Sequence, residues 1–79
     1  MDTGDALRAM VGRSGLSLRA ASVASGRTPE WLSATLARGS APTMPVAADL
    51  ARACGHTLAL IPSDDVPPSA IVIDPPARQ

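Results

Sequence analysis

The chain has 79 residues, of which 46% are hydrophobic, and its seven basic and seven acidic side chains give a formal net charge of zero. This length allows one small domain, which buries only about 60% of the surface exposed by the unfolded chain, so we expect a second copy to add stability. One cysteine and one histidine exclude an intramolecular disulfide, and a zinc site of three or four nitrogen and sulfur ligands within one chain.

The start of the chain and its hydropathy bear on where the protein is found. The segment from Met1 to Asp5 is acidic, and no apolar run approaches the roughly 20 residues that span a bilayer. We therefore expect a soluble cytoplasmic protein with no signal peptide, no membrane partner, no metal and no cofactor.

Glycines and capping residues mark the first two predicted helices. The first helix ends at the glycine pair Gly12 and Gly15, and its apolar residues recur at i, i+3 and i+4, namely Leu7, Met10 and Val11. Ser17 is a preferred N-cap for a second helix over residues 18–25, and Gly26 supplies the left-handed residue that ends it.

The third predicted helix covers residues 28–38, with Thr28 as its N-cap and Gly39 after its last residue. Leu32 and Leu36 lie one turn apart and must face the core. The opposite side is therefore small and polar, and it is made of Glu30, Ser33, Ala34, Ala37 and Arg38.

Thr43 opens a fourth predicted helix that runs to Cys54 and is closed by Gly55. Its apolar stripe is Met44, Ala47, Leu50, Ala51 and Cys54. Cys54 is interpreted as a small hydrophobic core residue, and His56 as a surface or cap residue.

The apolar spacing changes to two after the fourth helix. Leu58 and Leu60, then Ile71 and Ile73, alternate with their neighbours and flank a proline-rich loop over residues 62–69, which predicts two short strands. The predicted fold class is mainly α, with four to five helices and a short C-terminal β-hairpin or dimerisation strands. The predicted organisation is a helical domain over 1–56, a β appendage over 57–74 and a flexible tail over 75–79.

The zero net charge conceals two segments of opposite sign. Between Ala6 and Gly39 five arginines face one glutamate, which gives five minus one, or +4. From Ser63 onward three aspartates face one arginine, which gives one minus three, or −2. The sequence therefore predicts a basic helical body and an acidic C-terminal part.

The second and third predicted helices are joined by a tight turn that contains glycine. This is the geometry of a helix-turn-helix, whose second helix is presented to the major groove of DNA. The run from residue 6 to about 62 resembles the lambda-repressor-like, XRE-type helix-turn-helix family, through Leu16, Ser17, Ala24, Gly26, Thr28, Pro29, Trp31, Leu32, Ser33 and Leu36. The continuation T-L-A-L-I-P resembles HipB-like antitoxins, and this resemblance implies a C-terminal strand that pairs across a dimer.

The candidate DNA-binding residues divide into two groups by the part of DNA that they suit. The first group lies at helix termini and in the loop after the third helix, where side chains suit contacts with phosphates: Ser17, Arg19, Ser40 and Thr43. The second group lies in the turn and on the third helix, where side chains suit contacts with base edges: Arg27, Thr28, Glu30, Ser33, Ala34 and Arg38. Because the chain has no asparagine and its only glutamine is Gln79, bidentate contacts to adenine are absent from the globular part.

These features predict a sequence-specific binder of double-stranded DNA that acts as a repressor or autoregulator, antitoxin-like or of the phage type. A two-fold homodimer fits inverted half-sites about one helical turn, ~34 Å, apart. The predicted dimerisation residues are Leu58, Leu60, Ile71 and Ile73, because a monomer of this size should not expose so much apolar surface.

An alternative is a protein-interaction module that keeps the helix-turn-helix scaffold and binds and inhibits a partner, such as a toxin or a host enzyme. The family usually places glutamine where Leu18 stands and polar residues where Ala34 and Ala37 stand, and these departures favour the alternative. Trp31 suits either packing between helices or contact with the DNA backbone. An enzyme is not expected, because the chain lacks lysine, tyrosine, a second histidine and a glycine-rich phosphate loop.

Overall fold

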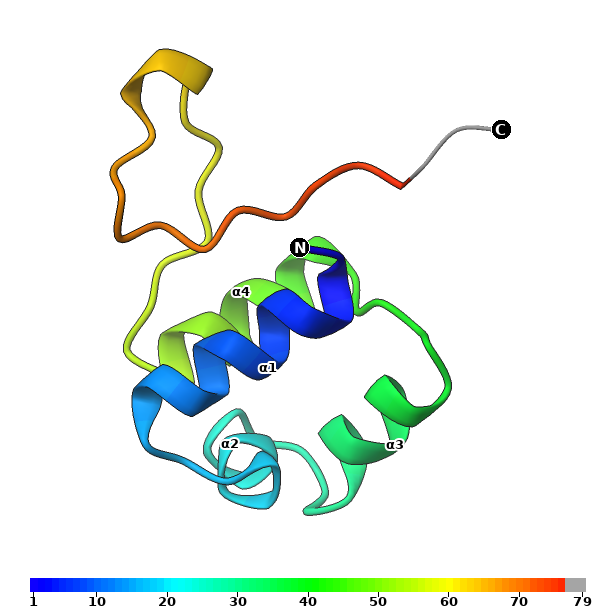
Figure 1. Ribbon diagram of the computed structural model, residues 1–79. Coiled ribbons are helices and arrows are strands. Elements are labelled where there is room, and N and C mark those ends of the chain that lie inside the picture. The colour runs from blue at the N-terminus through cyan, green and yellow to red at the C-terminus, as the bar shows by residue number, and fades with distance from the viewer. Residues whose placement is uncertain (77–79) are drawn as a thin grey trace.

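The computed structural model describes residues 1–76 as a bundle of four short helices with an extended C-terminal segment (Figure 1). In chain order the elements are α1 (Thr3–Ser14), α2 (Leu18–Ala24), α3 (Trp31–Ala37), α4 (Met44–Ala53) and the 3₁₀ turn η1 (Ser63–Asp65). The mainly helical class and the four helices of the prediction are confirmed. Of the predicted tail, residues 77–79 lie outside the described residues.

The N-terminus of α2 agrees with its prediction, whereas that of α3 does not. Ser17 caps α2, and its Oγ accepts a hydrogen bond from the Ala20 N–H at 3.0 Å. The prediction of Thr28 as the N-cap of α3 is wrong, because Glu30 holds that position. The Trp31 N–H donates to the Thr28 carbonyl at 3.1 Å, and this three-residue spacing closes a tight turn before the helix begins.

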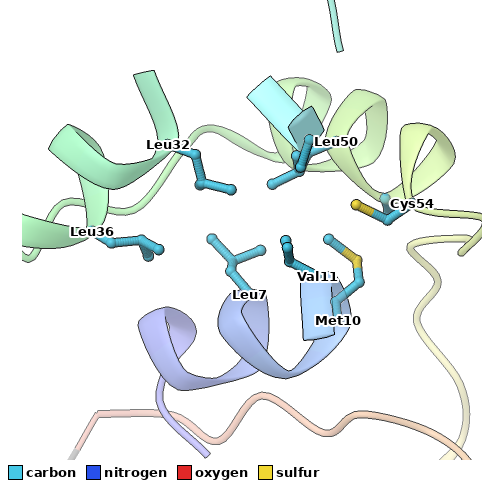
Figure 2. Close-up of a cluster of buried hydrophobic side chains, with 9 residues drawn as sticks. Leu7, Met10, Val11, Leu32, Leu36, Leu50 and Cys54 are labelled. Atoms are coloured by element: carbon cyan, nitrogen blue, oxygen red, sulfur yellow. The ribbon is translucent and has the colours of Figure 1, made fainter. Parts of the chain in front are cut away.

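The hydrophobic core lies between α1, α3 and α4, with α2 closing one side (Figure 2). Leu32 on α3 and Leu50 on α4 are completely buried, as the helical spacing requires. The other core residues are Leu7, Met10, Val11, Ala21, Leu36, Ala51 and Cys54. Burial of these side chains stabilises the domain, because helices of seven to twelve residues are marginal in isolation.

One member of the predicted stripe on α4 does not reach the core. Met44 is 69% exposed, whereas Leu50, Ala51 and Cys54 are buried. Met44 points within about 20° of the buried Ala51, two turns later, so its exposure comes from its place as the first residue of the helix and not from its angle. The inclusion of Met44 in the buried stripe is therefore corrected.

The predicted β appendage is not present, since the described residues 1–76 contain no strand. Leu58–Leu60 and Ile71–Ile73 lie outside regular secondary structure and do not pair with each other as strands. The segment between them contains three prolines, which restrict its backbone, and a 3₁₀ turn, so it is not the short tight turn that favours a hairpin. A lone two-stranded ribbon is also marginal in water, so local packing decides where these residues lie.

The C-terminal segment instead lies against α1 (Figure 1). Arg13, near the end of α1, donates from Nη1 to the Ser69 carbonyl at 2.6 Å, and the Asp74 N–H donates to the Met1 carbonyl at 2.8 Å. Residues 69–74 therefore run antiparallel to the helix. Ile71 is half-buried against the core, so the segment completes the hydrophobic cluster as a strap and not as a strand.

Candidate nucleic-acid interface

The turn between α2 and α3 is closed by backbone hydrogen bonds around Gly26. The Gly26 N–H donates to the Val23 carbonyl at 2.9 Å, and the Arg27 N–H donates to the Ser22 carbonyl at 3.0 Å. Gly26 has a φ of 81°, a left-handed conformation that glycine adopts at little cost. This Schellman arrangement ends α2 and redirects the chain toward α3.

A buried serine connects the two helices directly. Ser22 has no exposed surface, and its Oγ donates to the Leu18 carbonyl at 2.8 Å and accepts from the Leu32 N–H at 3.1 Å. Leu32 is in the first turn of α3, where backbone N–H groups have no partner within the helix. Ser22 therefore acts as a cap supplied by α2 and fixes the start of α3 against it.

The outer side of α3 matches the predicted face. Ser33 and Ala37 are exposed, and Ala34 is half-buried, whereas Leu32 and Leu36 are buried. Arg38 follows the helix as an exposed C-cap. The helix thus presents small side chains flanked by one guanidinium, a surface narrow enough to enter a groove.

Arg19 and Glu30 form an ion pair across the helix pair. Their Nη1 and Oε1 atoms are 3.3 Å apart, and both side chains are about 70% exposed, at 71% and 72%. Such exposed pairs contribute little to stability. The pair instead neutralises charge beside the outer face of α3, so the +4 of the sequence segment is not all available to a phosphate backbone.

Arg27 differs from the other predicted contacts because its side chain is packed inside the fold, with only 22% exposed. Its guanidinium lies 4.9 Å from the centre of the Trp31 ring, and its Nη1 donates to the Ser25 carbonyl at 2.7 Å. Its Nη2 is 3.7 Å from Oδ2 of Asp49 on α4. The structure thus places Arg27 at the junction of α2, α3 and α4.

The remaining predicted contacts carry exposed hydroxyl groups. Ser17 accepts the capping bond of α2, which leaves its own O–H as a donor. Thr43 caps α4 with its backbone and makes no side-chain capping bond. Thr28 and Ser40 are also exposed. These four hydroxyls surround α3 in sequence and suit phosphate oxygens, which accept hydrogen bonds.

The described part of the chain holds no group of three or more histidine, cysteine, aspartate or glutamate residues that could bind a metal. Over residues 1–76 no helix is both long and apolar enough to cross a membrane. Cys54 is buried and forms no disulfide, and His56 Nδ1 donates a hydrogen bond to the Cys54 carbonyl at 2.7 Å.

Two connecting residues escaped the sequence interpretation, Ser22 and Asp49. Ser22 follows Leu18 by four residues and adjoins the buried Ala21, so it stands on the core side of α2. A serine at such a position is a signal for a buried hydrogen bond. Asp49 carries no comparable signal, because its partner Arg27 is distant in sequence.

The helix pair, its tight turn and the exposed outer side of α3 define a helix-turn-helix protein. Residues 2–63 match the helix-turn-helix domain family, which is more than half of the chain, and the protein belongs to that family. DNA binding is the activity that this domain suggests. No curated protein and no solved structure matches the chain significantly.

Proposed function

We propose that the protein is a sequence-specific DNA-binding regulator that binds as a homodimer and represses transcription, including that of its own gene. The observation that carries this proposal is the exposed outer side of α3, which the Ser22 hydrogen bond fixes against α2. The resemblance of the sequence to XRE-type repressors and HipB-like antitoxins supports the regulatory role. A rigid helix with small exposed side chains is suited to the major groove.

The proposed base contacts come from few groups. Arg38 suits guanine, Glu30 suits the amino group of cytosine, and Ser33 offers a hydroxyl to either kind of base. Ala34 presents a methyl group, which suits the thymine methyl. Thr28 offers a second hydroxyl to a base edge. Ser17, Arg19, Ser40 and Thr43 would contact the backbone, and such contacts position the protein without reading the sequence.

The dependence of binding on salt tests this proposal directly. With Arg19 and Arg38 as the exposed cations beside α3, one or two neutralised phosphates per subunit give a dimer a log–log slope of roughly −2 to −4. Titration of affinity against potassium chloride, with the DNA upstream of the gene as the probe, measures this slope. Affinity that ignores salt, or that is equal for unrelated DNA of the same length, contradicts the proposal.

The proposed dimer rests on exposed apolar side chains of the C-terminal segment. Leu60 is 93% exposed, and Leu58 and Ile73 are more than 40% exposed, at 42% and 45%. Ile71 already packs against its own core. A second copy is the occupant that would cover the three exposed residues and also bring two α3 helices to inverted half-sites.

We expect Leu60→Asp to convert the dimer into a monomer at micromolar concentration with unchanged helix content. In a monomer this nearly fully exposed position tolerates charge, whereas an apolar interface does not. Sedimentation velocity measures the change. Ser63→Asp, which adds the same charge nearby without removing an apolar side chain, is the control, and a wild-type protein that is monomeric at this concentration contradicts the dimer.

A second candidate function is the binding of a protein partner through the same apolar segment. The exposure of Leu60 and the neutralisation of Arg19 by Glu30 favour it, because the first suits a protein surface and the second weakens attraction to phosphate. A wild-type protein that fails to shift the upstream DNA but forms a stable complex with the product of an adjacent gene supports this candidate over DNA binding.

A further inference from the structure

We infer that Arg27 is a positioning residue, which sets the orientation of α3 through Trp31 and does not itself contact DNA. This inference rests on the proposed DNA binding and refines it. The sequence predicts Arg27 as a base contact, because it lies in the turn of the helix pair. The surroundings of its side chain point to a different role.

The guanidinium of Arg27 is occupied on its face and on both terminal nitrogens. The Trp31 ring covers one face at 4.9 Å, Nη1 donates to the Ser25 carbonyl at 2.7 Å, and Nη2 is 3.7 Å from the Asp49 carboxylate. A guanidinium suits this arrangement because it is planar, stacks on aromatic rings and donates in fixed directions. An ammonium group cannot satisfy the three partners together.

These partners belong to three different elements. Ser25 is the C-cap of α2, Trp31 is the first residue of α3, and Asp49 lies within α4. Because α3 has only seven residues, its direction is set by packing and not by its own helical stability. Arg27 and the buried Ser22 thus hold the same end of α3, one from outside the core and one from within it.

Other arginines contrast with Arg27. The side chain of Arg19 is 71% exposed, against 22% for Arg27, and Arg38 is also exposed. Within residues 1–76, Arg38 takes part in no ion pair with a side chain. Arg38 is therefore available to a phosphate or a base, and it serves as the matched comparison for Arg27.

The test compares Arg27→Lys with Arg38→Lys in binding to the upstream DNA over a range of salt. Lysine keeps the charge but loses the stacked, planar geometry. We expect Arg27→Lys to weaken binding about 5- to 10-fold, the range of a partly desolvated cation–π contact, with the salt slope unchanged. Arg27→Ala should likewise keep the slope, whereas loss of a phosphate contact reduces it by about 0.9 per subunit.

Trp31 fluorescence gives a readout that does not depend on DNA. Trp31 is the sole aromatic residue, so its emission and its quenching by acrylamide report only its own surroundings. We expect both Arg27→Lys and Arg27→Ala to increase quenching. A double-mutant cycle of Arg27→Lys with Trp31→Leu should show coupled losses of affinity, since both substitutions remove the same contact.

The outcomes separate this inference from the proposed function. Wild-type protein that binds no DNA overturns both. Intact wild-type binding overturns the inference alone if Arg27→Lys binds as tightly as wild type, if Arg27→Ala lowers the salt slope, or if the losses in the cycle add independently. Circular dichroism at the assay temperature confirms that each variant is folded when its affinity is measured.

Discussion

Ser22→Ala is expected to lower the free energy of unfolding by about 2 kcal/mol and the melting temperature by roughly 10 °C. The substitution leaves the Leu32 N–H without its partner, since Ser22 Oγ accepts from it at 3.1 Å. The Leu18 carbonyl loses only a second donor, because the backbone of α2 also pairs with it. The higher helix propensity of alanine offsets about 0.5 kcal/mol of the loss, so the unpaired N–H dominates.

Urea denaturation followed by circular dichroism measures this change. Ser33→Ala is the matched control, because Ser33 is exposed and its Oγ bond to the Glu30 carbonyl, at 3.2 Å, lies on the surface. We expect the control to change stability by less than about 0.5 kcal/mol. Equal stabilities for wild type and Ser22→Ala would show that the Leu32 N–H does not depend on the serine.

The effect on stability should extend to DNA binding. A loss of about 2 kcal/mol is a large share of the stability of a chain this small. Since Ser22 holds the first turn of α3, Ser22→Ala should also weaken binding under conditions in which the protein is still folded. Ser33→Ala, in contrast, should weaken binding without changing stability, because it removes a proposed contact.

The C-terminal ends of the helices were predictable because the signals that mark them are local. Gly15, Gly26, Gly39 and Gly55 adopt left-handed conformations just after their helices, as predicted. Gly12, which was predicted to end the first helix together with Gly15, instead lies within α1. Leu32 and Leu36 face the core because helical spacing alone requires it. The same reasoning placed the end of the third helix at residue 38, one residue beyond its last residue, Ala37, in the structure.

The C-terminal segment could not be predicted in this way. Its alternating apolar residues predict strands, but spacing does not say what the segment pairs with, and no strand forms within residues 1–76. The hydrogen bonds of Arg13 with Ser69 and of Met1 with Asp74 join residues far apart in sequence. The predicted strands themselves contain no proline, but no pairing forms between them, and Ile71 packs on the core instead.

In the candidate interface, the exposure of side chains on a single helix could be predicted from the sequence. Contacts between residues of different elements could not. Ser33, Ala37 and Arg38 are exposed as the helical projection requires. The environment of Arg27 depends on Trp31 and Asp49, and the ion pair of Arg19 depends on Glu30 across the turn. The sequence predicts DNA contacts for Arg19, Arg27 and Arg38, whereas only the tertiary structure reveals that Arg19 and Arg27 already have partners within the fold.

Ala37→Glu is expected to weaken binding to the upstream DNA by about 100-fold, or about 2.7 kcal/mol, with the fold retained. Ala37 is exposed on the same side of α3 as Glu30, seven residues or two turns earlier. A carboxylate there would enter the groove between two phosphate backbones, and apposition of like charges costs several kcal/mol. The cost to stability is small, about 0.3–1 kcal/mol, because a negative charge opposes the dipole at the C-terminal end of a helix.

Two controls separate charge, size and position in this experiment, which uses a gel shift at fixed salt. Ala37→Gln has the size of the glutamate variant without its charge, and it should retain more affinity, since glutamine can also contact adenine. Ser63→Glu adds the same charge on the exposed turn η1, away from α3, and should change affinity less than about twofold. Equal binding by Ala37→Glu and wild type would place the DNA on another face. Equal losses for Ala37→Glu and Ser63→Glu would instead show an effect of net charge. If α3 lies in the groove, the carboxylate at position 37 weakens binding far more than the one at position 63.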